Sequence, residues 1–273
     1  SDHLTVLNPN YVEWQAAMLP GMAGWQVSTY TGAATYSIPL NLPEGPGGFK
    51  PSLELSYNSQ VIDNAGIYSQ ASWVGMGWSL DVPYIQREFG GTNSVGDDLF
   101  SIHLNGVSGI LLRDTEGYWH TEDESFGRIK LHDGSPNDTT SWWEVWLKDG
   151  TRYIFGSEVD GSRAYADIPY CWDGSVVENI PWQWGLSKII SRYGQEIHIL
   201  YDRYQPPIHS FNCGEQTELT VDGTFWMYPK EILYPQDAYI VKFNFEEKRS
   251  DYQAGWDNHN TSTLAAYMKN RLG

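Results

Sequence analysis

Short segments that alternate between apolar and polar residues, separated by glycine-containing turns, run through most of this chain. Asn105-Gly106 lies between SIHL and VSGILL, and Asp149-Gly150 lies between WEVWLK and TRYIFG. An Asx-Gly pair between alternating segments is the strongest short-range signal for a β-hairpin, because both residues tolerate positive φ angles. The pattern therefore predicts antiparallel hairpins with two-residue turns, and not parallel strands joined by helices.

The same pattern predicts further strands and another turn at Gly194. The composition agrees, since 15% aromatic and 19% charged residues with 27 Gly and 14 Pro are typical of a turn-rich β protein. The segments predicted as strands are 52–59, 78–89, 99–114, 117–123, 128–133, 141–156, 184–202, 226–235 and 239–249. The fold class that follows is all-β, an antiparallel hairpin meander.

Two segments near the termini have helical spacing instead. In residues 8–22, Tyr11, Trp14 and Met18 recur at near-helical intervals, and Pro20-Gly21 would end a helix. The segment STLAAYMKNRLG, which ends the chain, is also compatible with a short helix. We therefore expect short helical segments near both termini.

The chain has no low-complexity linker, and a boundary is expected in the irregular stretch 156–181. The expected organisation is an N-terminal arm over residues 1–25, a first β region over 26–160 and a second over 161–273. Because the chain starts at Ser1 without a Met or a signal-like segment, it is expected to be a processed or excised segment.

The charge balance bears on possible partners. The chain has 17 Lys and Arg against 34 Asp and Glu, a formal net charge of −17. This argues against nucleic-acid binding, in which clustered Lys and Arg displace counterions from phosphates. No apolar run of about 18 residues predicts a membrane span. Cys171 and Cys213 lack zinc-binding spacing, and both a single disulfide and two free thiols are consistent with them.

A search for catalytic and cofactor-binding motifs finds none. Val107-Ser108-Gly109 lacks the first glycine and the strand-to-helix setting of a nucleophile elbow. The seven histidines never pair at metal-ligand spacing, and His103 and His198 are interpreted as hydrogen-bonded sheet residues. GPGG lacks the helix and the lysine–hydroxyl pair of a phosphate loop. No catalytic, cofactor-binding or metal-binding residue is therefore assigned.

Acidic residues cluster in three places. A glycosidase needs two carboxylates about 5–9 Å apart across a cleft, which adjacency in sequence does not provide. The interpretation we favour is that they are solvated turn residues, with calcium binding and catalysis as weaker alternatives. The acids concerned are Asp97, Asp98, Glu122, Asp123, Glu124, Glu246 and Glu247.

Tryptophans supply a second candidate, because flat aromatic faces with a polar tip suit carbohydrate recognition. In SWWEVW, alternation places Trp142 and Trp146 on the face of Glu144, and Trp143 on the opposite face. Packing in the core or at an interface is the favoured interpretation and sugar stacking the alternative. The other tryptophans considered are Trp119, Trp182 and Trp184.

The segment WVGMGWSL, residues 73–80, predicts a corner in a sheet. Gly75 and Gly77 have the spacing of a bend or bulge, where missing Cβ atoms let backbones approach closely. Trp78 and Leu80 would then share one face of the following strand, with the buried face preferred. A ligand platform would involve Trp73.

These motifs together resemble the SpvB/TcaC-type N-terminal region of bacterial toxin-complex and Rhs/YD-repeat proteins. The matching residues include Thr31-Gly32, Ile38-Pro39, Gly47-Gly48, Pro51, Leu53, Leu55, Tyr57, Ser59, Gly75, Gly77, Trp78 and Leu80. LKDGTRYIFG, WGLSKIISRYGQEIHILYD and YPKEILYP are similar to later motifs of that family. The resemblance runs in order from about residue 21 to the end, although residues 58–72 exceed the family's usual short turn.

The resemblance implies extended curved sheets of the Rhs/YD-shell type in a secreted, extracellular bacterial protein. It implies a non-enzymatic role, in which the region builds part of a shell or a docking surface for a separate C-terminal toxin domain. The implied partners are the remainder of the same polypeptide or a companion toxin-complex subunit. The alternatives are a carbohydrate-binding module that uses exposed tryptophans and, more remotely, a glycosidase. A sheet that ends at YIVKFNFEE would have an open edge unless another segment covers it.

Overall fold

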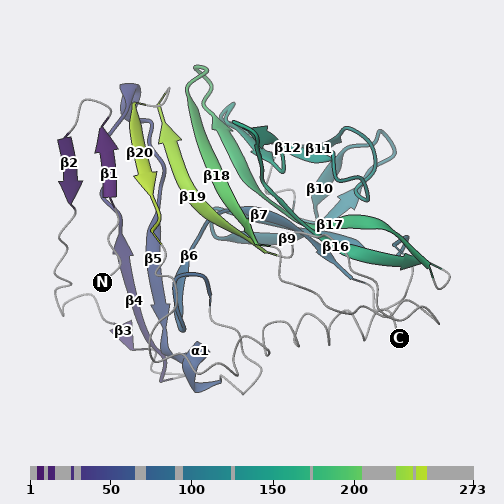
Figure 1. Ribbon diagram of the computed structural model, residues 1–273, viewed down its shortest axis with the longest axis horizontal. Coiled ribbons are helices and arrows are strands. Elements are labelled where there is room, and N and C mark those ends of the chain that lie inside the picture. Colours follow the sequence, from purple (N-terminus) through teal and green to yellow (C-terminus); the bar gives the residue numbers. More distant parts are fainter. Residues whose placement is uncertain are drawn as a thin grey trace.

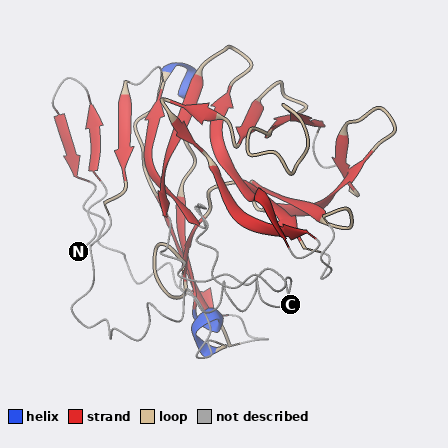
Figure 2. Ribbon diagram, turned by 45° about the vertical axis from the view of Figure 1, so that its right-hand side comes forward, coloured by secondary structure: helices blue, strands red, loops and turns tan. Residues whose placement is uncertain are grey.

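A computed structural model of the chain consists mainly of β-strands, and the all-β prediction is confirmed (Figures 1 and 2). The structure describes residues 5–8, 12–15, 26–27, 32–64, 72–89, 95–123, 127–172, 175–204, 226–235 and 238–244. Within these ranges, no helix is long and apolar enough to cross a membrane.

The largest part of the fold is a closed antiparallel β-barrel of eight strands. Its strands follow one another as a meander from β7 to β13, and β17 lies between β13 and β7 and closes the ring. The strands are β7 (Tyr84–Glu88), β8 (Leu99–Leu104), β9 (Val107–Arg113), β10 (Trp119–Thr121), β11 (Arg128–His132), β12 (Trp142–Trp146), β13 (Arg152–Phe155) and β17 (Ser175–Ile190). Closure removes the free edges that a flat sheet would expose.

The sheet continues out of the barrel through the far end of β17, which pairs with β18. The resulting open extension has the order β18-β19-β20-β1-β2 and lies to the left of the barrel in Figure 1. Its strands are β18 (Glu196–Tyr204), β19 (Trp226–Tyr234), β20 (Tyr239–Lys242), β1 (Thr5–Asn8) and β2 (Val12–Gln15). One continuous sheet thus carries strands from both expected β regions, and the boundary between those regions stays a prediction.

The expected N-terminal helix is wrong where the structure describes it, because Val12–Gln15 form β2. The stretch contains a β-branched and a large aromatic residue, which favour strands. β1 pairs with β20 on one side and β2 on the other, so ladder hydrogen bonds replace helical ones. The edge of β20 that the sequence left open is covered by the N-terminal strand β1. The expected C-terminal helix lies outside the described residues.

A second, four-stranded sheet lies against the extension. Its order is β3-β4-β5-β6, and every pairing in it is antiparallel. The short helix α1 (Ser59–Asp63), capped by the side chain of Asn58, connects β5 toward β6. The strands are β3 (Gln26–Val27), β4 (Ala34–Pro39), β5 (Glu54–Asn58) and β6 (Trp78–Leu80).

The stretch 156–181, expected to be irregular, contains several strands. β14 (Glu158–Val159) and β15 (Ser162–Arg163) form a small hairpin, and β16 (Tyr165–Trp172) pairs along β17. The register of β16 and β17 shifts at two places, between Ala166 and Asp167 and between Tyr170 and Cys171. These irregularities interrupt the period of two that identifies a strand in a sequence.

The three predicted turns are present, with one difference in detail. Asn105 and Gly106 both have positive φ angles and join β8 to β9 as a two-residue turn. At the β12–β13 hairpin, the Leu147 N–H donates to the carbonyl of Thr151, and Gly150 is the loop residue with a positive φ. That loop therefore has three residues and not the predicted two. Gly194 likewise adopts a positive φ between β17 and β18.

Candidate functional site

The four-stranded sheet packs against the extension through an apolar interface, which we call the seam. The inner face of the extension contributes Ile199, Ile232 and Val241, each at most 4% exposed. The small sheet contributes Leu53 and Leu80 to the same cluster. Because side chains alternate across a strand, the period of two in both sheets places these residues on facing surfaces.

Two hydrogen bonds and one close approach hold the small-sheet side in a fixed position against the extension. Tyr234 Oη donates to the carbonyl of Pro43 at 3.1 Å, and Gln195 Nε2 donates to the carbonyl of Pro46 at 2.6 Å. Burial, reinforced by the neighbouring Tyr239, raises the pKa of the Tyr234 hydroxyl, which keeps it a donor. Gly45 leaves no room for a Cβ, which would lie 2.8 Å from Pro235 Cγ.

A cavity of about 500 Å³ lies between the small sheet, one end of the barrel and the extension. Its aliphatic walls come from Leu186, Ile189, Ile197, Ile199 and Ile232, and its polar residues include Lys50, Glu54, Asp81, Asn105, Thr151 and Tyr153. Lys50 is held by Glu44 at 3.1 Å. The cavity is therefore a gap in the seam, with polar groups from the small-sheet and barrel sides and only aliphatic side chains from the extension.

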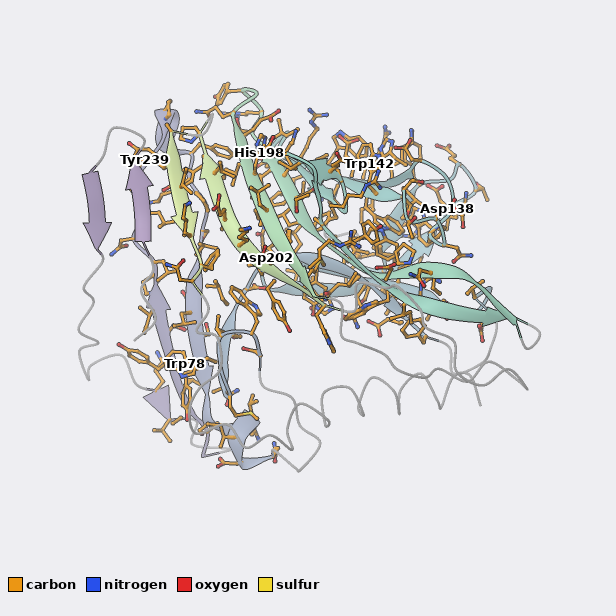
Figure 3. All side chains as sticks on the ribbon, viewed as in Figure 1. Trp78, Asp138, Trp142, His198, Asp202 and Tyr239 are labelled. Carbon is orange, nitrogen blue, oxygen red and sulfur yellow. The ribbon has the colours of Figure 1, made fainter. Side chains whose placement is uncertain are left out.

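The corner predicted for residues 73–80 is confirmed. Gly75 and Gly77 have φ angles of +120° and +77°, and a Cβ on Gly77 would lie 2.9 Å from Ile62 Cδ1. Trp78 packs on Tyr57, with ring centroids 5.1 Å apart, while Leu80 is buried (Trp78 is labelled in Figure 3). Glycine is favoured at both positions because an L side chain would be strained there, and at Gly77 a side chain would also collide. The corner therefore brings β6 back against β5.

Trp73, the residue considered for a ligand platform, packs into the seam. Its ring meets that of Phe243 edge to face at a centroid distance of 5.5 Å. This contact ties the corner to the end of β20 across the two sheets. The half-buried Trp73 thus serves interlayer packing.

The barrel interior is filled by aromatic side chains, which decides the role of three tryptophans. Trp143 and Trp184 are 0% exposed. The ring centroid of Phe100 lies 5.6 Å from that of Trp143 and 5.9 Å from that of Trp184. Trp119 lies 5.2 Å from Trp143 in an edge-to-face arrangement. Trp143 and Trp184 are core residues that cannot present a face to a sugar, and the half-buried Trp119 packs against this core. The favoured interpretation is confirmed for them.

Trp142 and Trp146 share one face of β12 with Glu144, as alternation in SWWEVW predicts, and the structure makes this the outer face of the barrel. His132 stacks on Trp142 at 4.0 Å with an interplanar angle of 5°, and Asp133 accepts the Trp142 indole N–H at 2.7 Å (Figure 3). Glu144 lies between Trp142 and Trp146 along β12, and its carboxylate contacts both His132 and Arg152. The outer aromatic surface is therefore already engaged by neighbouring protein groups.

Cross-strand ion pairs cover the outer face of the extension, as solvated sheet faces commonly do. His198 and Lys188 both contact Glu196 Oε2, at 2.7 and 3.4 Å. Lys230 pairs with Asp202, which Figure 3 labels together with His198 on β18. His198 is thus a hydrogen-bonded sheet residue, as predicted.

The described acidic residues of the predicted clusters form no common metal site, and the interpretation as a solvated turn residue is wrong for Asp98. Asp98 is buried and paired, whereas Asp97 and Asp123 are exposed, and no group of three or more metal-ligating side chains occurs among the residues described. Glu124, Glu246, Glu247 and Cys213 lie outside the described residues. The absence of catalytic, metal and cofactor sites stays a prediction, and a disulfide and two free thiols stay alternatives for the cysteines.

Sequence analysis missed Arg87, whose side chain is fully buried. Its guanidinium donates to Asp98 and to the carbonyls of Pro136 and Pro181, all within 3.0 Å. It also donates to Asn137 and lies 5.0 Å from the centroid of Phe100. The alternation of YIQRE does place Arg87 on the face of Ile85, and this was the available signal.

Comparison with known proteins identifies one family in part of the chain. Residues 28–92 match the family model described as SpvB, Salmonella virulence plasmid 65kDa B protein. No curated protein matches the chain. The matched residues include the small sheet from β4 to β6 and the first barrel strand, β7.

Three solved structures show a partial structural similarity to this chain. The crystal structure of TcdB2-TccC3 gives a TM-score of 0.48 at 20% identity, covering 77% of this chain and 10% of that one. The Photorhabdus luminescens Tc holotoxin pore gives 0.45 at 18% identity, covering 74% and 9%. The N-terminal domain of effector protein SpvB from Salmonella typhimurium strain LT2 gives 0.45 at 18% identity, covering 72% and 63%.

This chain spans about a tenth of the length of the toxin-complex chains and 63% of the SpvB domain. The family match confirms the resemblance that the motifs of residues 31–80 indicate. The similarity to SpvB is thus shown for residues 28–92.

Proposed function

We propose that this chain is a non-enzymatic structural region of a secreted bacterial toxin-complex-like protein. In that protein it forms part of a shell, or a docking surface, for a separate C-terminal toxin domain. The observation that carries the proposal is the SpvB-type match of residues 28–92, which form a sheet layer fastened to the extension by the seam. The toxin-complex and Rhs motifs in the remaining sequence support the same assignment.

The arrangement of the strands suits a scaffold. The barrel is packed with side chains, and the extension continues its sheet by antiparallel addition of one strand after another. At the end of the described strand order, β2 has β1 on one side, and a sheet edge of this kind can accept a further strand. The partners we propose are the remainder of the same polypeptide or a companion toxin-complex subunit.

The proposal is tested on the protein as its source organism produces it. An affinity tag is placed in the genomic copy, the protein is recovered from the culture medium, and cross-linked peptides are identified by mass spectrometry. We expect cross-links between residues of the extension or seam and a further β-rich segment or toxin domain. Recovery of the tagged protein with no such segment, or only from inside the cells, would contradict the proposal.

Two further measurements separate the proposed role from the alternatives. A glycan array probed with the purified protein is expected to show no binding above background, whereas a carbohydrate-binding module would select particular sugars. Polysaccharide hydrolysis at ordinary enzymatic rates would contradict the structural assignment. A response on the array that is lost in Trp142→Ala would favour the carbohydrate-binding alternative.

A further inference from the structure

On the outer face of the barrel, close to the Asn105-Gly106 turn, a serine and a histidine face each other across two strands. Ser108 on β9 pairs with His103 on β8, and Ser108 Oγ lies 2.8 Å from His103 Nδ1. In a two-residue hairpin the pair that flanks the turn exchanges the ladder hydrogen bonds, so the next pair brings its side chains closest together. The hairpin itself thus positions the hydroxyl against the ring.

The second ring nitrogen of His103 is linked through Ser101 to the carboxylate of Glu88. His103 Nε2 lies 3.4 Å from Ser101 Oγ, and Ser101 donates its hydroxyl hydrogen to Glu88 Oε1 at 2.5 Å. Because that hydrogen is committed to Glu88, Ser101 can only accept from His103. The proton of a neutral imidazole therefore belongs on Nε2, which leaves the lone pair of Nδ1 free to accept the Ser108 hydroxyl.

The surroundings hold the ring in place and favour its neutral form. Tyr84 on β7 stacks on His103 with centroids 4.4 Å apart and an interplanar angle of 22°. Burial lowers the pKa of His103, and the charges that oppose this shift come from Glu88 and Asp81. The half-buried ring is thus a neutral acceptor at neutral pH, while Ser108 is exposed.

We propose that Ser108 is a site of covalent modification, a hydroxyl activated by His103 that accepts acyl groups from activated esters. Ser108 Oγ forms a bond to the carbonyl carbon of the ester, the bond from that carbon to the alcohol oxygen breaks, and the hydroxyl proton passes to His103 Nδ1. Ser101 and Glu88 act as positioning residues that hold the tautomer. The reaction acylates the protein once and requires no turnover, so it is independent of the function proposed above.

The test uses p-nitrophenyl acetate and maps acetylated peptides by mass spectrometry at early times. Ser79, an exposed strand serine that lies opposite Ser56 on the small sheet, is the internal control within the same molecule. General-base assistance contributes about 10²–10⁴-fold in proton transfer, so Ser108 should be acetylated at least about tenfold faster than Ser79. Equal rates at the two serines would overturn the proposal without requiring any variant.

Two variants and a pH profile separate activation from mere exposure. His103→Phe preserves a ring that can stack on Tyr84 and should bring the rate at Ser108 down to that at Ser79, with an unchanged circular dichroism spectrum. Ser101→Ala, which leaves the Ser108–His103 contact intact, should slow acetylation and shift its pH profile. In the unaltered protein the rate should rise as His103 loses its proton, with a midpoint below the ordinary histidine pKa of about 6.5. A rate insensitive to both replacements would overturn the proposal.

Discussion

Arg87 Nη1 and Asp98 Oδ2 lie 2.7 Å apart, and both side chains are 0% exposed. Arg87 belongs to the first barrel strand, while its other acceptors precede β12 or lie within β17. Arg87 therefore links the β7–β8 hairpin, through Asp98, to β17, which meets β7 only when the barrel has closed. Buried charges persist when every partner is supplied, and removal of one partner leaves the other uncompensated.

Replacement of Asp98 by Ala should destabilise the protein by about 3–5 kcal/mol, because the Arg87 guanidinium would remain buried without its carboxylate. Urea unfolding followed by tryptophan fluorescence measures the change. The neighbouring Asp97→Ala is the matched control, since Asp97 is exposed and its loss should cost much less. Equal losses of stability in the two variants would show that the buried pair is not the cause.

Gly77→Ala should cost more stability than Gly106→Ala. Both glycines have φ angles near +75°, so both variants bear the left-handed backbone cost of about 1–2 kcal/mol. Only at Gly77 would the new Cβ also lie about 3.0 Å from Tyr57 Cε2 and closer still to Ile62, whereas nothing lies within 4 Å at Gly106. Thermal unfolding of the two variants compares them directly, and a smaller effect at Gly77 would contradict the packing of the corner.

Trp143→Ala and Trp142→Ala test the two faces of one strand. Loss of the fully buried Trp143 ring should destabilise the barrel by about 3–5 kcal/mol through lost contacts and a cavity. Loss of the outward Trp142 removes only its contacts with His132 and Asp133 and should cost clearly less. If chemical denaturation showed the larger effect for Trp142, the assigned orientation of β12 would be wrong.

Glu196→Gln should make stability less dependent on acid pH. Burial raises the pKa of Glu196, but His198 and Lys188 outweigh it and place the pKa below its usual value. A carboxylate with a depressed folded-state pKa stabilises above its unfolded-state pKa of about 4.3, and this contribution is lost as the pH falls through the folded-state pKa. The stability difference between the unaltered protein and the variant should therefore shrink between about pH 6 and pH 3. A difference that is constant over this range would refute the assignment.

Local structure was predictable wherever a turn and its two strands are consecutive in the chain. Asn105-Gly106 fixes β8 against β9, and Gly75 with Gly77 fixes the corner before β6, because positive φ angles need particular residues at those positions. The same local rule failed at residues 12–15, whose spacing suited a helix. There β2 pairs with β1, and β1 is in turn held by β20, which lies more than 200 residues away in the chain.

The sequence by itself determined an all-β chain of antiparallel hairpins, the resemblance of the motifs in residues 31–80 to SpvB, and the alternation that sends Trp142 and Trp143 to opposite faces. Only the tertiary structure decided that β17 closes a barrel by pairing with both β7 and β13, and that Arg87 is buried with Asp98. Hairpin pairing depends on neighbours in sequence, so its signal is local. Barrel closure and burial depend on which distant strands can satisfy one another's hydrogen bonds and apolar faces, and no short segment records that choice.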